Sequence, residues 1–192
     1  MQKSNIQIIA GKHRGKKLYM AGEQTRSSKN ILKESVFNTL QFEVPDSIWV
    51  EVFAGTGSIG LEALSRDAKY AYFLEKDSEA IKVLNKNIQE CRETQNCEVI
   101  LGDSFETIWD VIEKLKRNKQ KAFFYFDPPF AIRDGFNDIY DKVIDTITHL
   151  PKINVEKIII EHQSDIEFPD TIAKYKKTKT RKFGKSSVTY YE

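Results

Sequence analysis

Short apolar segments alternate with amphipathic segments through the middle of this 192-residue chain. Five apolar runs predict buried strands. The segments between them carry apolar residues at helical spacing. Strands that alternate with helices favour a parallel sheet with helices on both faces. The sequence therefore predicts an α/β fold: a Rossmann-like, doubly wound, mostly parallel sheet. The predicted strands are residues 48–53, 70–75, 98–101, 122–126 and 155–161.

The two ends of the chain follow other patterns. Residues 172–183 and 186–191 predict an antiparallel hairpin that completes a seven-stranded sheet. At the front, residues 5–10 and 16–20 predict a small β-hairpin. Residues 29–41 predict a helix. We expect an N-terminal hairpin and helix extension over residues 1–46 and a main domain over residues 47–192. The helix would bury Ile31, Leu32, Val36, Phe37 and Leu40, and Ser78 would cap a later helix.

A glycine-rich loop follows the first strand of the main domain. Gly55, Gly57 and Gly60 match G-x-G-x-x-G at a strand-to-helix turn. Glycine there lets the backbone approach a ligand closely before the helix begins. Glu75 ends the next strand, where a carboxylate can accept hydrogen bonds from ribose hydroxyls. At this point NAD and S-adenosylmethionine fit the pattern equally.

The neighbouring acids favour S-adenosylmethionine. Glu51 precedes the glycine loop, where a carboxylate would repel a pyrophosphate but attract the cationic amino group of a methionine moiety. Asp103 follows the third strand and can accept from the adenine amino group, or it can simply cap the next helix. The candidate cofactor-binding residues are Glu51, Phe53, Gly55, Gly57, Glu75, Lys76, Asp103, Ser104 and Asp127.

The fourth strand leads directly into Asp127-Pro128-Pro129-Phe130. An acid at this strand end lies where ligands bind in open α/β sheets. The two prolines remove two backbone donors and stiffen the loop, which leaves carbonyl acceptors beside the carboxylate. These acceptors and an aromatic ring suit a planar base with an exocyclic amino group. The alternative is an edge loop with a capping Asp and a core Phe. Asp127, Pro128 and Phe130 are the candidate catalytic residues.

Positive charge gathers at both ends of the chain. Residues 1–47 carry eight Lys/Arg and four Asp/Glu, and residues 171–192 carry seven Lys/Arg and one Glu. The whole chain has a net charge of +2, so the middle is acidic. Clustered positive charge is typical of nucleic-acid partners. The leading RNA-binding candidates are Lys12, Arg14, Lys16, Lys17 and Arg26. Residues 174–185 form a second basic patch, or a charged edge strand that discourages aggregation.

Composition excludes several classes of protein. No apolar run approaches the length of a membrane span, and the first five residues lack the apolar core of a signal peptide. Two cysteines, Cys91 and Cys97, make neither a disulfide framework nor a metal site. We therefore expect a cytoplasmic protein with no bound metal and no membrane partner.

The quoted motifs resemble those of class I S-adenosylmethionine-dependent methyltransferases. The glycine loop is similar to their first motif, and residues 127–130 are similar to the motif of enzymes that methylate amino groups. A narrower resemblance covers nearly the whole chain. Residues 8–18, 25–38 and 53–66 are similar to segments of the bacterial 16S ribosomal RNA guanine-N2 methyltransferase family. Glu51 stands where that family usually has Asp, and Phe130 where Tyr is frequent.

The resemblance implies methylation of the exocyclic N2 amine of a guanine in 16S ribosomal RNA, free or within a small-subunit assembly particle. Asp127 and the Pro128 carbonyl would orient the amine and Phe130 would stack on the base. A monomer is expected. Three alternatives stay open: a DNA or other RNA amino-methyltransferase, a non-catalytic RNA-binding or assembly factor on the same fold, and an NAD enzyme, which Glu51 and the two prolines disfavour.

Overall fold

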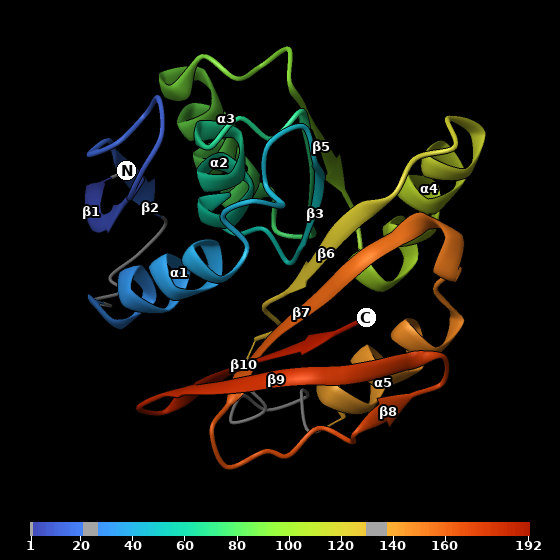
Figure 1. Ribbon diagram of the computed structural model, residues 1–192. Helices are drawn as coiled ribbons and strands as arrows, with labels where there is room; N and C mark the ends of the chain where they lie inside the picture. The colour runs from blue at the N-terminus through green and yellow to red at the C-terminus, as the bar shows by residue number, and fades with distance from the viewer. Residues whose placement is uncertain (1, 21–26, 130–137) are drawn as a thin grey trace.

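The computed structural model describes residues 2–20, 27–129 and 138–192 (Figure 1). A two-stranded sheet and an eight-stranded sheet are present in these ranges, together with five α-helices. In chain order the elements are β1 (Gln2–Gln7), β2 (Lys17–Met20), α1 (Ser27–Thr39), β3 (Ile48–Val52), α2 (Ser58–Ser65), β4 (Tyr70–Glu75), α3 (Ser78–Cys91), β5 (Cys97–Leu101), α4 (Ser104–Arg117), β6 (Ala122–Phe126), α5 (Ile139–His149), a 3₁₀ turn (Lys152–Asn154), β7 (Val155–Gln163), β8 (Thr171–Ile172), β9 (Tyr175–Phe183) and β10 (Ser186–Tyr191).

The large sheet has the strand order β5-β4-β3-β6-β7-β10-β9-β8. The first five of these strands are parallel, and β10, β9 and β8 continue the sheet in antiparallel register. The chain runs outward from β3 to β5 and then returns to place β6 on the other side of β3. This reversal is the topological switch point, where open α/β sheets bind their ligands. The predicted doubly wound sheet is confirmed.

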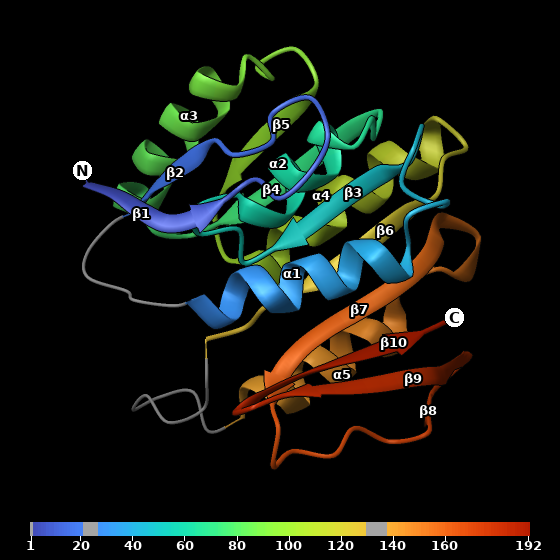
Figure 2. The same ribbon diagram turned by 60° about the vertical axis from the view of Figure 1, so that its left-hand side comes forward.

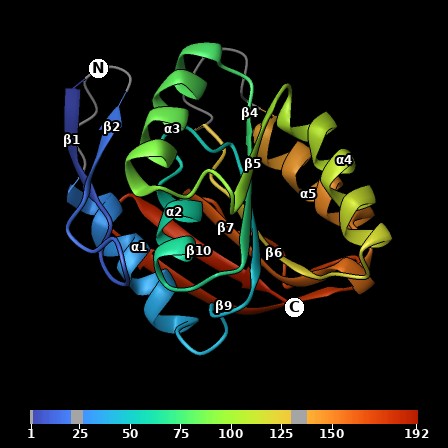
Figure 3. The ribbon, with the colours of Figure 1, turned by 90° about the horizontal axis from the view of Figure 1, so that it is seen from above.

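Helices cover both faces of the sheet (Figure 3). One face packs against α4 and α5 through a large apolar cluster that includes Val50, Phe124 and Ile158. The opposite face packs against α1 and α2 through Trp49, Tyr125 and Ile159. Because side chains alternate along a strand, every second residue of β3, β6 and β7 faces α1 and α2. This parity decides which side chains meet α1.

Helix α1 lies across β3 and β6 on that face (Figure 2). Its buried stripe contains Leu32, Val36 and Phe37, as predicted, but also a lysine, Lys33, that is only 2% exposed. Ile31 was predicted to be buried and is 62% exposed, so that prediction was wrong. The stripe follows positions 29, 32, 33, 36, 37 and 40, which leaves position 31 on the solvent side of the helix.

The N-terminal hairpin is attached to the main sheet through the buried Glu62 of α2. The Glu62 carboxylate accepts hydrogen bonds from the backbone N–H groups of Ile9, at 2.7 Å, and Ala10, at 3.0 Å. It also accepts from Arg66 Nε at 2.8 Å and lies 3.4 Å from Lys33 Nζ. The predicted strand 5–10 therefore ends at Gln7, because Ile9 and Ala10 bond to Glu62 instead of to β2.

Two further predictions need correction. The large sheet has eight strands instead of seven, because residues 172–183 are divided between β8 and β9. Ala173 takes a φ of 51°, and this left-handed turn folds Thr171 and Ile172 back onto the start of β9. The second correction concerns helix α3, whose cap is Asp77 and not Ser78. The Asp77 side chain accepts from Glu79 N at 2.8 Å.

None of the helices in the described ranges is long and apolar enough to cross a membrane. The two cysteines are free thiols, as expected: Cys91 is buried at the end of α3 and Cys97 begins β5.

Glu62→Gln is expected to lower the free energy of unfolding by about 3–5 kcal/mol, because it leaves the buried Lys33 ammonium without its anion. Urea denaturation would measure the loss, and hydrogen exchange at Ile9 and Ala10 would report whether the hairpin detaches. Glu113→Gln removes a carboxylate from an exposed pair with Lys116 and should cost less than about 1 kcal/mol. Equal losses in the two variants would contradict this role for Glu62.

Candidate active site

Four neighbouring strands bring the candidate acids to one edge of the sheet. The carboxyl ends of β5, β4, β3 and β6 lie side by side in that order. Asp103, Glu75 and Asp127 follow or end β5, β4 and β6, and Glu51 precedes the last residue of β3. The switch point lies between β3 and β6, so Glu51 and Asp127 flank it. The structure thus brings together the acids that the sequence placed at successive strand ends.

The glycine loop turns sharply from β3 into α2. Phe53 has a φ of 77°, and its ring contacts Phe105 of α4 edge-on at 5.3 Å between centroids. At Gly55 the φ is 52°, and a Cβ there would meet nothing within 4 Å, so a ligand can reach this backbone. Gly57 has a different constraint, since its added Cβ would lie 2.3 Å from Leu84 Cδ1. Gly55 therefore provides ligand access, while Gly57 allows the helix to pack.

Glu51 is buried under the first turn of α2. Its carboxylate accepts from the backbone N–H groups of Ile59, at 3.2 Å, and Gly60, at 2.9 Å. Burial nevertheless dominates, and it raises the pKa of Glu51 to about 8, with the nearby Asp127 charge adding to the rise. A cationic ligand group beside Glu51 would oppose this shift. The Glu51 side chain is thus buried in the protein, whereas a strand end usually leaves an acid open to solvent.

Glu75 organises the loops around the second and third strand ends. One carboxylate oxygen accepts from Gly55 N at 2.8 Å, and the other accepts from the backbone N–H groups of Lys76, at 2.8 Å, and Asp77, at 2.9 Å. Asp103 is exposed and caps α4 by accepting from Phe105 N at 2.9 Å, which confirms the capping alternative. Ser104 is buried, whereas Lys76 is exposed.

Asp127 contacts groups that the sequence did not identify. Lys29 Nζ of α1 donates to Asp127 Oδ2 and lies 3.6 Å from Oε1 of Glu161, a buried carboxylate of β7. Tyr125 donates from its hydroxyl to Glu161 Oε2 at 3.1 Å. Pro128, which follows Asp127 in the chain, is buried. Phe130 lies outside the described residues, as does Arg26.

A sequence signal for these contacts existed. Lys29 and Lys33 lie four residues apart within the apolar stripe of α1, so they share the helix face that packs on the sheet. Glu161 directly follows an apolar run, Ile158-Ile159-Ile160, and is the last residue of the predicted buried strand. Lysines in a buried stripe and an acid in a buried strand need partners, because an unpaired buried charge is costly.

Some of the predicted RNA-binding side chains are engaged within the protein. Lys12 pairs with Glu93 at 2.9 Å, His13 Nε2 lies 2.6 Å from the same carboxylate, and Lys16 Nζ donates to the Glu90 carbonyl. Burial alone would raise the pKa of Glu93, but hydrogen bonds from Asn96, Lys12 and His13 outweigh it and lower the pKa. These contacts hold the hairpin loop against α3. Arg14 and Lys17 are exposed.

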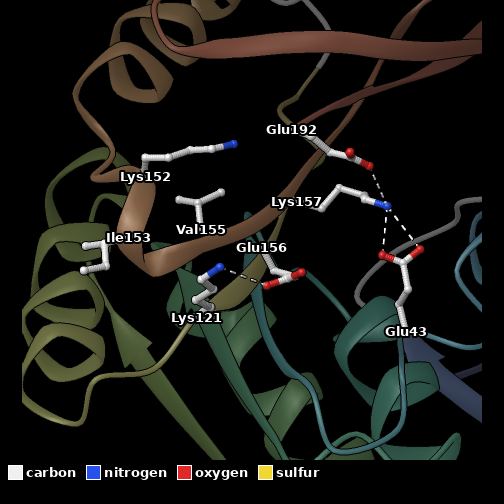
Figure 4. Close-up of a pocket in the computed structure, with 8 residues that line it drawn as sticks. All are labelled: Glu43, Lys121, Lys152, Ile153, Val155, Glu156, Lys157 and Glu192. Atoms are coloured by element: carbon white, nitrogen blue, oxygen red, sulfur yellow. Dashed lines mark hydrogen bonds and ion pairs between the residues drawn. The ribbon is translucent and has the colours of Figure 1, made fainter.

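A pocket within the described residues lies away from the candidate acids (Figure 4). It encloses about 570 Å³ at the amino ends of β6 and β7 and includes Glu43, Lys157 and Glu192. Lys157 pairs with Glu43 and Glu192 at 2.9 Å each, and Lys121 lies 3.8 Å from Glu156. Its charges are therefore largely paired within the protein. The candidate site lies at the opposite edge of the strands, where the acids and the glycine loop meet.

The fold and the arrangement of the candidate site indicate the class of protein. The sheet, the glycine loop at the switch point and the acid-Pro-Pro edge form the Rossmann-like fold of the methyltransferases. A solved structure named "Putative methyltransferase yhhF from Escherichia coli" superposes with a TM-score of 0.75 and 26% identity, covering 97% of this chain and 96% of that one.

The chain belongs to the family described as "Conserved hypothetical protein 95", whose model matches residues 6–192. "Putative rRNA methyltransferase YlbH" of Bacillus subtilis is 26% identical over 97% of this chain and 98% of that protein. "Ribosomal RNA small subunit methyltransferase D" of Haemophilus influenzae is 36% identical over 67% of this chain. That alignment spans 65% of the Haemophilus protein, which is less than two thirds of its length.

Glu51→Gln is expected to stabilise the ligand-free protein as pH rises. The folded-state pKa of about 8 lies above the ordinary value of 4.5. Between these values the folded chain retains a proton that the unfolded chain releases, so the wild type loses stability as pH rises from about 5 to 8. The variant should therefore gain about 1–4 kcal/mol on the wild type over this range.

Urea denaturation at several pH values would measure the difference, with Glu113→Gln as the control. S-adenosylmethionine affinity, measured by calorimetry, should fall in Glu51→Gln if the carboxylate holds a cationic ligand group. A stability difference that does not change with pH would contradict the assignment of the buried charge.

Proposed function

We propose that this protein transfers a methyl group from S-adenosylmethionine to the exocyclic N2 amine of a guanine in 16S ribosomal RNA. The observation that carries the proposal is the position of Asp127 and Pro128 beside the glycine loop at the switch point. The names of the relatives support ribosomal RNA as the substrate. The resemblance of residues 8–18 and 25–38 to the guanine-N2 family supports the target base.

The residues at the strand ends fit this cofactor. The open space at Gly55 lets a ligand lie against the loop backbone. Glu51 offers a buried carboxylate for the amino group, Glu75 accepts for the ribose hydroxyls, and Asp103 is exposed at the edge where the adenine would lie. The cofactor supplies a methyl group that is already activated on a sulfonium. The protein's own contribution is therefore chiefly to position the amine.

Asp127 and Pro128 provide that positioning. A guanine amine is a poor nucleophile because its lone pair conjugates into the ring. Asp127 and the Pro128 carbonyl would accept its two hydrogens, turn the lone pair toward the methyl group and offset the positive charge that develops. Lys29 occupies Asp127 Oδ2, so we assign Oδ1 to the amine. Phe130 would stack on the base once it has left its stacked setting.

The N-terminal hairpin would hold RNA phosphates. Arg14 and Lys17 are exposed and are the leading contacts, while Lys12 and Lys16 also hold the hairpin on α3. The exposed cations of β9 form a second surface, and Arg181 of this strand donates to Ser35 Oγ of α1 at 2.8 Å. Because β8 pairs with only the first two residues of β9, the rest of the described strand is also a charged edge. An rRNA substrate would place the protein in the cytoplasm.

The function is tested by comparing methyl transfer to small ribosomal subunits, naked 16S rRNA and duplex DNA. We expect transfer to RNA substrates, with the methyl group mapped to a guanine N2. Asp127→Asn should reduce turnover about 10²–10³-fold and leave cofactor affinity nearly unchanged, because the amine loses its charged acceptor. Asp110→Asn, on the exposed side of α4, is the matched control.

Preference for duplex DNA would indicate the DNA amino-methyltransferase. Failure to bind S-adenosylmethionine in calorimetry would favour a non-catalytic RNA-binding factor, and displacement by NAD would favour a dehydrogenase. Wild-type turnover in Asp127→Asn would contradict the role of this residue.

Arg14→Glu combined with Lys17→Glu should weaken RNA binding and reduce its salt dependence. Each lost phosphate contact removes about 0.7–0.9 from the slope of log K against log salt concentration. Binding measured between about 50 and 200 mM salt would give this slope. Lys116→Glu combined with Lys119→Glu makes the same charge change near the end of α4, on the opposite face of the sheet. If both double variants lower the slope equally, the effect belongs to net charge and not to the hairpin.

A further inference from the structure

Strand parity places three acids of the sheet beside α1. Trp49 and Ile159 belong to the apolar cluster beneath α1 and α2. Glu51 and Glu161 lie two residues further along β3 and β7, so their side chains project from the same face. Asp127 follows Tyr125 of β6 by the same interval. These three acids lie on β3, just after β6 and on β7, which are adjacent strands beneath α1.

Helix α1 brings two lysines to these acids. Lys33 pairs with Glu62 and its charge acts on Glu51. One turn earlier, Lys29 Nζ lies between Asp127 Oδ2 and Glu161 Oε1. The side chains of Lys29 and Asp127 are 23% and 25% exposed, so this pair faces the mouth of the site, whereas Glu161 at 3% lies beneath it.

Two carboxylates that share one cation are electrostatically coupled. The pKa of Glu161 is raised to about 7, chiefly by burial and also by the Asp127 charge, while Lys29 and the Tyr125 hydroxyl oppose the rise. Without Lys29 the two acids would face each other with no cation between them. Like-charged carboxylates in one site share a proton, which raises the apparent pKa at which the pair becomes fully ionised.

We propose that Lys29 and Glu161 are positioning residues for Asp127: Lys29 provides the positive charge beside its carboxylate, and together they turn this carboxylate so that Oδ1 faces the acceptor amine. The inference rests on the proposed amino-methylation. Lys29 fixes Oδ2 from one side, and Glu161, itself oriented by Tyr125, fixes Lys29 from below. Since Lys29 belongs to the first turns of α1, the predicted RNA-contacting extension contributes directly to the geometry of the reactive carboxylate.

Other ionisable groups also face this pair. Within the described residues, Glu51 of β3, Tyr125 of β6 and Tyr140 of α5 interact electrostatically with Asp127. Tyr125 and Tyr140 also interact with Glu161. These three groups interact in turn with Lys33 of α1, Tyr190 of β10 and Asp165 after β7, so all six are taken into account in the pH experiment below. The pKa values of the three tyrosines are raised, chiefly by burial, so they stay neutral across the pH range in which the carboxylates titrate.

Lys29→Met is expected to lower kcat about 10–100-fold, because a small misplacement of a reacting group carries a penalty of this size. The acidic limb of the pH profile of kcat should move up by about one to two units. Lys29→Arg should return the limb toward the wild-type position because it keeps the charge. Glu161→Gln added to Lys29→Met should also return the limb, since it removes the repelling carboxylate, while kcat stays low.

Lys114→Met is the matched control, because it removes a lysine from a carboxylate pair with Glu98 at a distance from Asp127. Melting temperatures would establish that every variant is folded. The carboxyl carbons of Asp127 and Glu161, followed by NMR in ¹³C-labelled protein, give a second measure that needs no turnover. We expect both to titrate higher in Lys29→Met than in the wild type.

Unchanged carboxyl titrations and an unchanged pH profile in Lys29→Met would overturn the inference, as would a profile that the added Glu161→Gln fails to restore. A wild-type protein that methylates no RNA would instead refute the proposed function. The NMR titrations would still decide whether Lys29 controls the ionisation of Asp127.

Discussion

Much of this structure depends on how buried carboxylates obtain positive partners. The face of the sheet beneath α1 carries Glu51 and Glu161, and α2 adds Glu62 beside them. An isolated charge in such a setting is costly, so each acid must be paired, hydrogen-bonded or protonated. Glu62 is paired with Lys33 and Arg66, and Glu51 accepts from the first turn of α2. Packing of α1 on the sheet therefore has an electrostatic component as well as an apolar one.

This arrangement explains how a small N-terminal extension becomes part of the site. The hairpin is attached through Glu62 at one end and through Glu93, just after α3, at its loop. Asn87 of α3 adds a third attachment, since its side chain bonds to the Tyr19 backbone and to the Thr56 carbonyl of the glycine loop. Motion of the hairpin would thus be felt at the loop that we propose holds the cofactor. The division into an extension over residues 1–46 and a main domain over residues 47–192 stays a prediction. The contacts described above join these two predicted parts to each other.

Local patterns predicted the arrangement of the sheet well. Residues 70–75 and 122–126 are strands with the predicted bounds, since a continuous apolar run between turn residues has few other solutions. The antiparallel strands at the end of the sheet were predicted less accurately. The left-handed turn there is formed by Ala173, and neither glycine nor asparagine, the residues that usually indicate such a turn, is present at that position. Ile31 was misplaced because apolar spacing alone did not show that a lysine could occupy the buried stripe.

The residues of the candidate site also differ in how far the sequence alone could predict them. Positions fixed by strand ends and turn chemistry, such as Gly55, Glu75 and Asp103, follow from the chain itself. Lys29 and Glu161 lie 98 and 34 residues from Asp127 along the sequence, and their meeting depends on strand order and parity together. Parity could have been read from the sequence, but the order of β6 and β7 beneath α1 could not. Contacts between distant charged residues therefore appear only once the fold is known.

The chemistry proposed here accounts for the retention of costly acids at this edge. A face built for stability alone would replace Glu51 and Glu161 with apolar residues of similar volume, which is often neutral or stabilising. An amine acceptor instead needs a fixed anion, and a cationic ligand group needs a buried one. The fixed anion, Asp127, follows β6 and the buried one, Glu51, belongs to β3, so both lie on the two strands that flank the switch point. Lys29 of α1 fixes the anion of the amine acceptor, because it pairs with the Asp127 carboxylate and restrains the direction in which that carboxylate points. Glu51 is different: within the described residues neutral N–H groups donate to its carboxylate and the Lys33 charge acts on it, and a bound cationic group would further favour its ionised form.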